Sequence, residues 1–99
     1  MKRTSSMVYT PSHESRELLL YCENTAQLYP RLQAIINALK KKAQKNQYDS
    51  NKAVDAYYNI TTTASDMYYR AFGGKFTVQQ RFTAAVDLER NLREQVFGQ

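Results

Sequence analysis

Apolar side chains recur every three or four residues along most of this 99-residue chain. An α-helix turns once every 3.6 residues, so this spacing places them together on one helical face. The first set spans about seven turns and comprises Leu18, Tyr21, Cys22, Thr25, Leu28 or Tyr29, Leu32, Ile35, Ile36, Leu39 and Ala43. No strand-like alternation or internal repeat accompanies it. The sequence therefore predicts an all-α protein.

Pro30 interrupts this first set of apolar positions. Proline lacks a backbone donor and clashes with the carbonyl four residues earlier, so it either kinks a helix or belongs in its first turn. One long helix could kink at Pro30, or two helices could meet between Asn24 and Pro30. We favour two helices, with Pro30 in the first turn of the second.

Two further helices follow, and the residues at their ends indicate where they begin and stop. Asp49 or Ser50 can cap the third helix, and Gly73-Gly74 stops it because glycine is favoured after a helix. Thr77 and Gln80 form a capping box for the last helix. Short connections place successive helices antiparallel, so we expect a small antiparallel bundle of four helices, or three if the first two are continuous.

The two later helices each have an apolar face that we expect to form part of the core. On the third helix this face comprises Ala53, Val54, Tyr57, Ile60, Thr61, Ala64, Met67, Tyr68, Ala71 and Phe72. On the last helix it comprises Val78, Phe82, Ala85, Val86, Leu88, Leu92 and Val96.

The length of the chain suits one domain with one modest core. We expect a flexible tail at residues 1–10 and a single bundle domain at residues 11–99, with the first helix starting at Thr10-Pro11. Cys22 is the single cysteine, which excludes an internal disulfide, and no apolar run is long enough to span a bilayer. A cytoplasmic location without a membrane partner is the expectation.

The net charge of +5 is concentrated in the first half of the chain, where residues 1–50 carry eight Lys or Arg against four Asp or Glu. No carboxylate lies between Glu23 and Asp49. The cations that could contact an anion or a nucleic-acid phosphate are Arg31, Lys40, Lys41, Lys42, Lys45 and Arg81. The helix dipole also favours lysines in a last turn, so capping and solubility alone would account for the lysine run.

Tyrosine pairs are the second distinctive feature. Tyr57-Tyr58 and Tyr68-Tyr69 are eleven residues apart, close to three helical turns, so the pairs lie above one another on one helix. Tyr57 and Tyr68 fall in the apolar face, whereas Tyr58 and Tyr69 fall at its edge. Aromatic side chains at such an edge can anchor a protein interface, stack bases or cover a neighbouring helix. Leu20, opposite Leu18 on the first helix, is a further interface candidate.

Glu89 lies within the apolar face of the last helix, where a carboxylate must be paired or neutralised. Arg93, one turn further on, or a tyrosine hydroxyl from the third helix can supply the partner. No second acid, nucleophile or base can be placed beside it, so we expect no catalytic site. His13 and Glu17 are one turn apart but lack a third ligand, and we expect neither a metal nor another cofactor.

Three stretches of the chain form a further pattern. They are Leu28-Tyr29 before an Ile-Ile-x-x-Leu-Lys-Lys-Lys helix, Tyr48-Asp49-x-x-Lys52-Ala53-Val54, and Phe76-Thr77-Val78-x-x-Arg81 followed by Ala84-Ala85. The pattern is similar to that of small, uncharacterised helical proteins common in phages and metagenomes, over roughly residues 16–95. The resemblance implies a phage-encoded accessory protein and transfers no functional residue.

From these observations we expect a non-enzymatic module that acts through its helix faces. The partner is a protein, with a second copy of the chain as the leading candidate. The alternative is a small basic protein that binds nucleic acid through the Lys40–Lys45 region.

Overall fold

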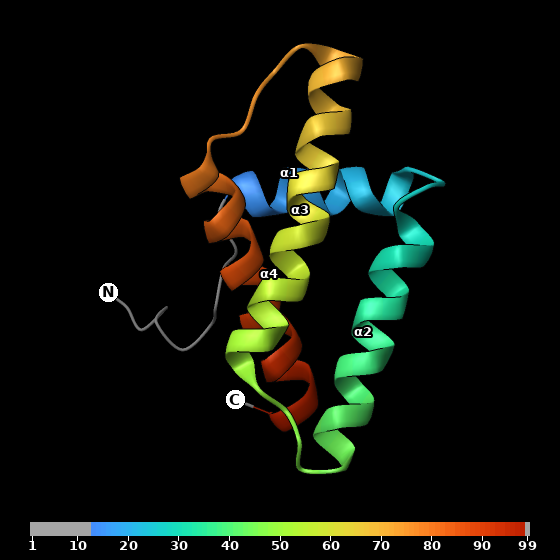
Figure 1. The fold of residues 1–99 in the computed structure, drawn as a ribbon, viewed down its shortest axis with the longest axis vertical. Coiled ribbons are helices and arrows are strands. Elements are labelled where there is room, and N and C mark those ends of the chain that lie inside the picture. The colour runs from blue at the N-terminus through green and yellow to red at the C-terminus, as the bar shows by residue number, and fades with distance from the viewer. Residues whose placement is uncertain (1–12, 99) are drawn as a thin grey trace, which may run out of the picture.

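The computed structural model describes residues 13–98, and these contain four helices joined by short connectors (Figure 1). The helices are α1 (His13–Asn24), α2 (Tyr29–Gln44), α3 (Ser50–Phe72) and α4 (Val78–Phe97). The predicted all-α class and the four-helix organisation are confirmed. The expected tail at 1–10 and the helix start at Thr10-Pro11 lie outside the described residues.

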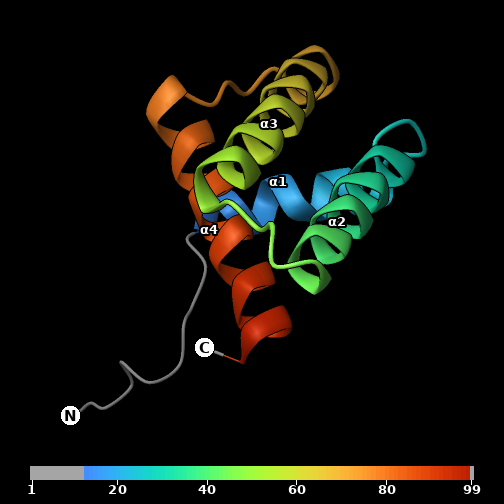
Figure 2. The same cartoon turned by 60° about the horizontal axis from the view of Figure 1, so that its bottom comes forward.

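The four helices differ in how they cross. α2, α3 and α4 run alternately in opposite directions, as expected for short connections, whereas α1 lies across them (Figure 1). The turned view shows the same crossing (Figure 2). α3 packs most extensively against α4, and α1 also packs mainly against α4. α2 has few contacts with the other helices, so one side of it faces solvent and a shallow groove.

The helical conformation is interrupted between α1 and α2, which confirms the prediction of two helices with Pro30 in the first turn of the second. The connector is a tight turn in which the backbone N–H groups of Leu28 and Tyr29 both donate to the carbonyl of Thr25. Pro30 costs no hydrogen bond there, because the first turn of a helix has no intrahelical acceptor for it. The turn buries Leu28 and leaves Tyr29 exposed, which settles which of the two belongs to the core.

Local end signals fix the limits of α3 and α4. Asp49 caps α3, because its carboxylate accepts from the backbone N–H groups of Asn51 and Lys52 at 2.9 and 3.3 Å. Gly73 ends α3 with a left-handed backbone at φ 84°. The capping box predicted for α4 is also present.

The core lies where α1, α3 and α4 meet, with α2 contributing from one side. Small residues allow α3 and α4 to approach closely. The hydroxyl of Thr61 donates to the carbonyl of Tyr58 at 3.0 Å and also lies 3.3 Å from the carbonyl of Arg81 across this contact. Tyr57 is buried, as its place on the apolar face predicts. The other buried apolar residues are Leu18, Cys22, Leu28, Leu32, Leu39, Ala43, Ala53, Ile60, Ala64, Phe76, Ala84, Ala85, Leu88 and Leu92.

Three large residues assigned to the core by periodicity are exposed instead, as is Ala71 at the end of α3. Phe72, Val78 and Phe82 all lie near the connection between α3 and α4. The end of α3 projects beyond the crossing with α1 (Figure 1), so it has fewer neighbours to cover it. Helical periodicity identifies the face on which a residue lies but not whether another element reaches that far along the helix.

The left-handed backbone at Gly73 leads to a first prediction. Replacing Gly73 with alanine should lower the free energy of unfolding by about 1–2 kcal/mol, because a Cβ disfavours this conformation. Chemical denaturation followed by circular dichroism measures the loss.

Gly74 is the matched control for that substitution, because its φ is not in the left-handed region. A Cβ on Gly74 would lie 3.4 Å from Cε1 of Tyr68, an ordinary contact distance. Gly74→Ala should therefore lower the free energy of unfolding by less than half as much as Gly73→Ala. Equal losses for the two variants would contradict the assignment of the helix stop to Gly73.

Candidate binding surfaces and the buried carboxylate

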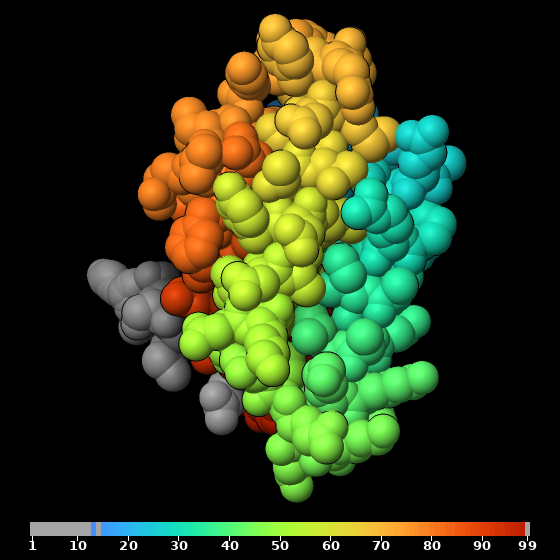
Figure 3. Space-filling model, in the orientation of Figure 1, coloured from blue at the N-terminus to red at the C-terminus, as the bar shows by residue number. Residues whose placement is uncertain are grey.

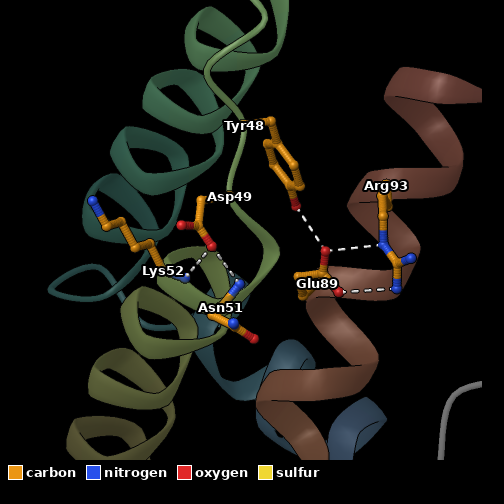
Figure 4. Close-up of polar contacts among 6 residues, drawn as sticks. All are labelled: Tyr48, Asp49, Asn51, Lys52, Glu89 and Arg93. Atoms are coloured by element: carbon orange, nitrogen blue, oxygen red, sulfur yellow. Dashed lines mark hydrogen bonds and ion pairs between the residues drawn. The ribbon is translucent and has the colours of Figure 1, made fainter.

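Among the side chains that the structure describes, Glu89 is the one charged group that is buried, with 2% of its surface exposed. The hydroxyl of Tyr48 donates to its Oε2 at 2.9 Å, and Nη2 of Arg93 donates to its Oε1 at 3.2 Å (Figure 4). Nε of Arg93 lies 3.0 Å from Oε2 and adds an ion-pair contact without a hydrogen bond. The carboxylate is thus held by one cation and one neutral donor.

The sequence predicts Arg93 as a partner of Glu89, and the structure has this pair. The tyrosine partner is different from the one expected, because Tyr48 belongs to the connector before α3 and not to α3 itself. Sequence reasoning does not identify Tyr48, because this residue stands among the polar residues Asn46, Gln47 and Asp49 of the connector. An aromatic residue inside a polar connector was the available signal, because such a side chain tends to pack against the fold.

Glu89 also influences two phenol groups. Burial, followed by the hydrogen bond to Glu89 and its negative charge, raises the pKa of Tyr48 above the ordinary value near 10. Burial and the same charge raise the pKa of Tyr57. Tyr48 therefore stays protonated as a hydrogen-bond donor at neutral pH. This arrangement joins the connector to α4.

The lysine run lies at the end of α2 that meets the connector to α3. Its four lysines are all exposed, and none forms an ion pair within the described part of the chain. Lys42 also lines the groove between α2 and α3, where Lys52 of α3 joins it. The members of this cationic end, as we name it, are Lys40, Lys41, Lys42, Lys45 and Lys52.

The two arginines proposed as anion contacts lie away from the cationic end. Arg31 is exposed in the first turn of α2, at the opposite end of that helix. Arg81 lies in the first turns of α4, and its Nη1 donates to the carbonyl of Phe76 at 2.8 Å. The fold therefore groups the lysines with Lys52 but does not bring Arg31 or Arg81 to them.

A hollow of about 310 Å³ lies between α1 and the end of α3. Apolar side chains surround most of it, and we call Leu20, Tyr21, Tyr68 and Phe72 the aromatic face. The ring centroids of Tyr21 and Tyr68 are 5.4 Å apart, and those of Tyr68 and Phe72 are 4.8 Å apart. Leu20 is 57% exposed and Phe72 is 68% exposed, although both are large and apolar.

The aromatic face includes one of the three interface residues predicted from the sequence, Leu20. Tyr69 lies next to this face on α3 and is exposed, with Nζ of Lys75 5.2 Å from its ring centroid. Tyr58 is half-buried and packs edge-on against Phe82 in the same chain, with centroids 6.3 Å apart. Phe72 was missed because its spacing assigned it to the core.

Two smaller features complete the description of polar and reactive groups. Nε2 of His13 lies 2.9 Å from Oε1 of Glu17. Within residues 13–98, no three His, Cys, Asp or Glu side chains gather closely enough to hold a metal ion. Cys22 is buried, and burial with the nearby Glu23 raises the pKa of its thiol to about 11.

Comparison of the chain with protein-family models, curated proteins and solved structures finds no match. Among the described helices, none is long and apolar enough to cross a membrane. The function therefore has to be argued from the surfaces themselves.

The contact between Tyr48 and Glu89 leads to a second prediction. Replacing Tyr48 with phenylalanine removes a donor from a buried carboxylate, so the free energy of unfolding should fall by about 1.5 kcal/mol at pH 7. Tyr29→Phe is the control, because Tyr29 is exposed. Equal stability of the Tyr48→Phe variant and the wild type would show that the contact contributes nothing.

The same variant should alter the response to alkaline pH. A folded-state pKa raised above the unfolded value stabilises the fold below the unfolded pKa, and this stability is lost as pH rises towards the folded value. The loss should begin near pH 9 through Cys22, whose folded pKa is about 11, and continue above pH 10 through Tyr48 and Tyr57. Tyr48→Phe should reduce the loss of folding stability above pH 10 and leave the loss between pH 9 and 10 unchanged. Denaturation at a series of pH values measures this.

Proposed function

We propose that this protein is a non-enzymatic interaction module that associates with a second copy of itself through the aromatic face. The observation that carries the proposal is the exposure of Leu20 and Phe72 beside a hollow of about 310 Å³. Large apolar side chains gathered around a concave surface are typical of protein interfaces. Scattered exposed apolar residues would carry no such meaning.

The composition of the aromatic face supports a protein partner. Tyrosine and phenylalanine are enriched at interface centres because they bury a large area with few rotatable bonds. Tyr68 is held in place by the rings of Tyr21, Phe72 and Phe76. Its hydroxyl donates to Oε2 of Glu17 at 3.4 Å. A surface that is already ordered in this way loses little side-chain entropy when a partner binds.

A second copy is the simplest partner, because most soluble oligomers are symmetric and use the same patch on both subunits. Leu20 of one copy would enter the hollow of the other, and the reverse contact would follow from the two-fold axis. Tyr69 would lie at the edge of such an interface. A cytoplasmic location, and the phage-encoded accessory role that the sequence resemblance implies, are parts of the same proposal.

The third prediction tests self-association. The wild type should be a dimer or larger species, measured by light scattering and sedimentation over a range of concentrations. Leu20→Lys and Phe72→Lys should each weaken association about tenfold or more, because a charge placed in an apolar interface must be desolvated.

Val78→Lys is the matched control for these variants. Val78 is 63% exposed and apolar but is not part of the aromatic face. Circular dichroism should show unchanged helicity for all three variants. A wild type that is monomeric at the highest concentration would reject self-association. If Val78→Lys weakened association as much as Leu20→Lys and Phe72→Lys do, the assignment to the aromatic face would also be rejected.

Nucleic-acid binding by the cationic end is the second candidate function. The observation that favours it is the exposure of four lysines at the end of α2, including the capping residue Lys45, without an ion-pair partner within residues 13–98. Positive charge that is not neutralised internally is available to phosphate groups. Arg31 and Arg81 lie elsewhere, so this candidate depends on the lysines and Lys52.

The fourth prediction separates this candidate from the first. If four lysines contact phosphates, doubling the salt concentration should lower the affinity for DNA or RNA about tenfold. Reversing the charge of Lys40, Lys41 and Lys45 to Glu should weaken binding, whereas Lys75→Glu should have a much smaller effect. Fluorescence anisotropy with labelled oligonucleotides measures both. Absence of binding at low ionic strength would dispose of this candidate.

A further inference from the structure

A groove of about 460 Å³ lies between α2 and α3, on a different part of the molecule from the aromatic face. Figure 3 shows the face on which these two helices lie side by side. The groove exists because alanines line it from both helices, namely Ala34 and Ala38 on α2 and Ala56 on α3. These side chains are too short to fill the space between the helices. Its volume and apolar walls are typical of a small-molecule site.

The groove is polarised along its length. Its polar residues, Lys42, Gln47, Asp49 and Lys52, all lie in or near the connector between α2 and α3. Its other walls are the apolar side chains further along the two helices, with Ile35 and Ala34 farthest from the connector on α2. One end of the groove is therefore charged, and the other end is apolar.

The charge at the polar end is positive. Asp49 is the only acidic residue lining the groove, and its carboxylate is engaged with the backbone N–H groups of Asn51 and Lys52 (Figure 4). Figure 4 also shows the side chain of Lys52 pointing away from Glu89, which is already paired with Arg93. α2 contains no acidic residue at all, so Lys42 has no carboxylate on its own helix. Lys42 and Lys52 thus line this end of the groove, and neither forms an ion pair within the described chain.

We propose that the groove binds a single-chain anionic amphiphile of the fatty-carboxylate class. The carboxylate lies at the connector end between Lys42 and Lys52, and the aliphatic chain runs between the helices towards Ala34. Eight residues separate Lys42 from Ala34 on α2, which corresponds to about 12 Å of helix.

The head-to-tail polarity of the groove distinguishes this ligand from an amphipathic helix. Such a helix is polar along one side and apolar along the other, so it needs charges along the whole groove. The lining residues here provide positive charge at one end only. This assignment does not depend on self-association through the aromatic face.

The test is calorimetric titration of the full chain with octanoate, decanoate and dodecanoate below their micellar concentrations. Each added methylene should tighten binding about four-fold until the apolar end is filled, after which the gain should stop. Decanol and decyltrimethylammonium have a neutral or cationic head on an alkyl chain one carbon longer, and they should still bind more weakly than decanoate. Equal binding of all three head groups, or no saturable binding of decanoate, would overturn the proposal.

Two variants assign the binding to this groove. The double variant Lys42→Gln with Lys52→Gln should lower the affinity for decanoate at least about tenfold. It should leave the affinity for decanol unchanged, because the lysines contact only the head group. Lys40→Gln with Lys41→Gln is the matched control, since neither residue lines the groove. The larger side chain of Ala38→Leu should fill the groove and abolish binding of all the fatty ligands tested.

Ala38 is exposed and leucine is a good helix former, so the Ala38→Leu variant should keep its helicity and its unfolding transition. Both are measured by circular dichroism. Undiminished decanoate binding by this folded variant would place the ligand elsewhere and refute the assignment.

Discussion

The hydrogen-bonded carboxylate of Glu89 is the constraint on which the arrangement of α2 and α3 depends. A charge removed from water is tolerated only with close partners, and removing one partner is expensive. Arg93 supplies the opposite charge from the next turn of the same helix, whereas Tyr48 reaches Glu89 from the connector. This second contact ties the connector to α4 and so fixes the end of α2 relative to the start of α3. The positions of Lys42 and Lys52 follow from it.

Alanines line both sides of α3, but they lie in a close helix contact on one side and in an open groove on the other. Ala64 of α3 and Ala84 and Ala85 of α4 are buried where these two helices pack extensively. Ala56 on the other side of α3 faces Ala38 across a groove that no side chain fills. The difference arises from the neighbouring helix. α4 packs extensively against α3, whereas α2 has few contacts with α3 and buries Leu32, Leu39 and Ala43. Small residues allow close approach, but they do not cause it.

Much of the fold could be predicted because its signals are local. Pro30, Asp49 and Gly73 act on their own backbone, and the spacing of apolar residues defines each helical face. The candidate surfaces could be predicted only in part, because they depend on which elements meet. Leu20 was expected to be exposed from its position opposite the apolar face, and it is. Phe72 has core spacing but lies where no helix covers it, and the partnership of Tyr48 with Glu89 joins residues 41 positions apart.

The 23-residue length of α3 sets the distance between the two candidate surfaces. The aromatic face uses the last turns of this helix and the groove uses its first turns, so about 35 Å of rigid rod separates its two ends. Two copies joined at the aromatic face would therefore carry two grooves, one on each copy, separate from the interface. Such a pair would be bivalent, and a scaffold displaying several acyl chains would be held by avidity even when each single site is weak.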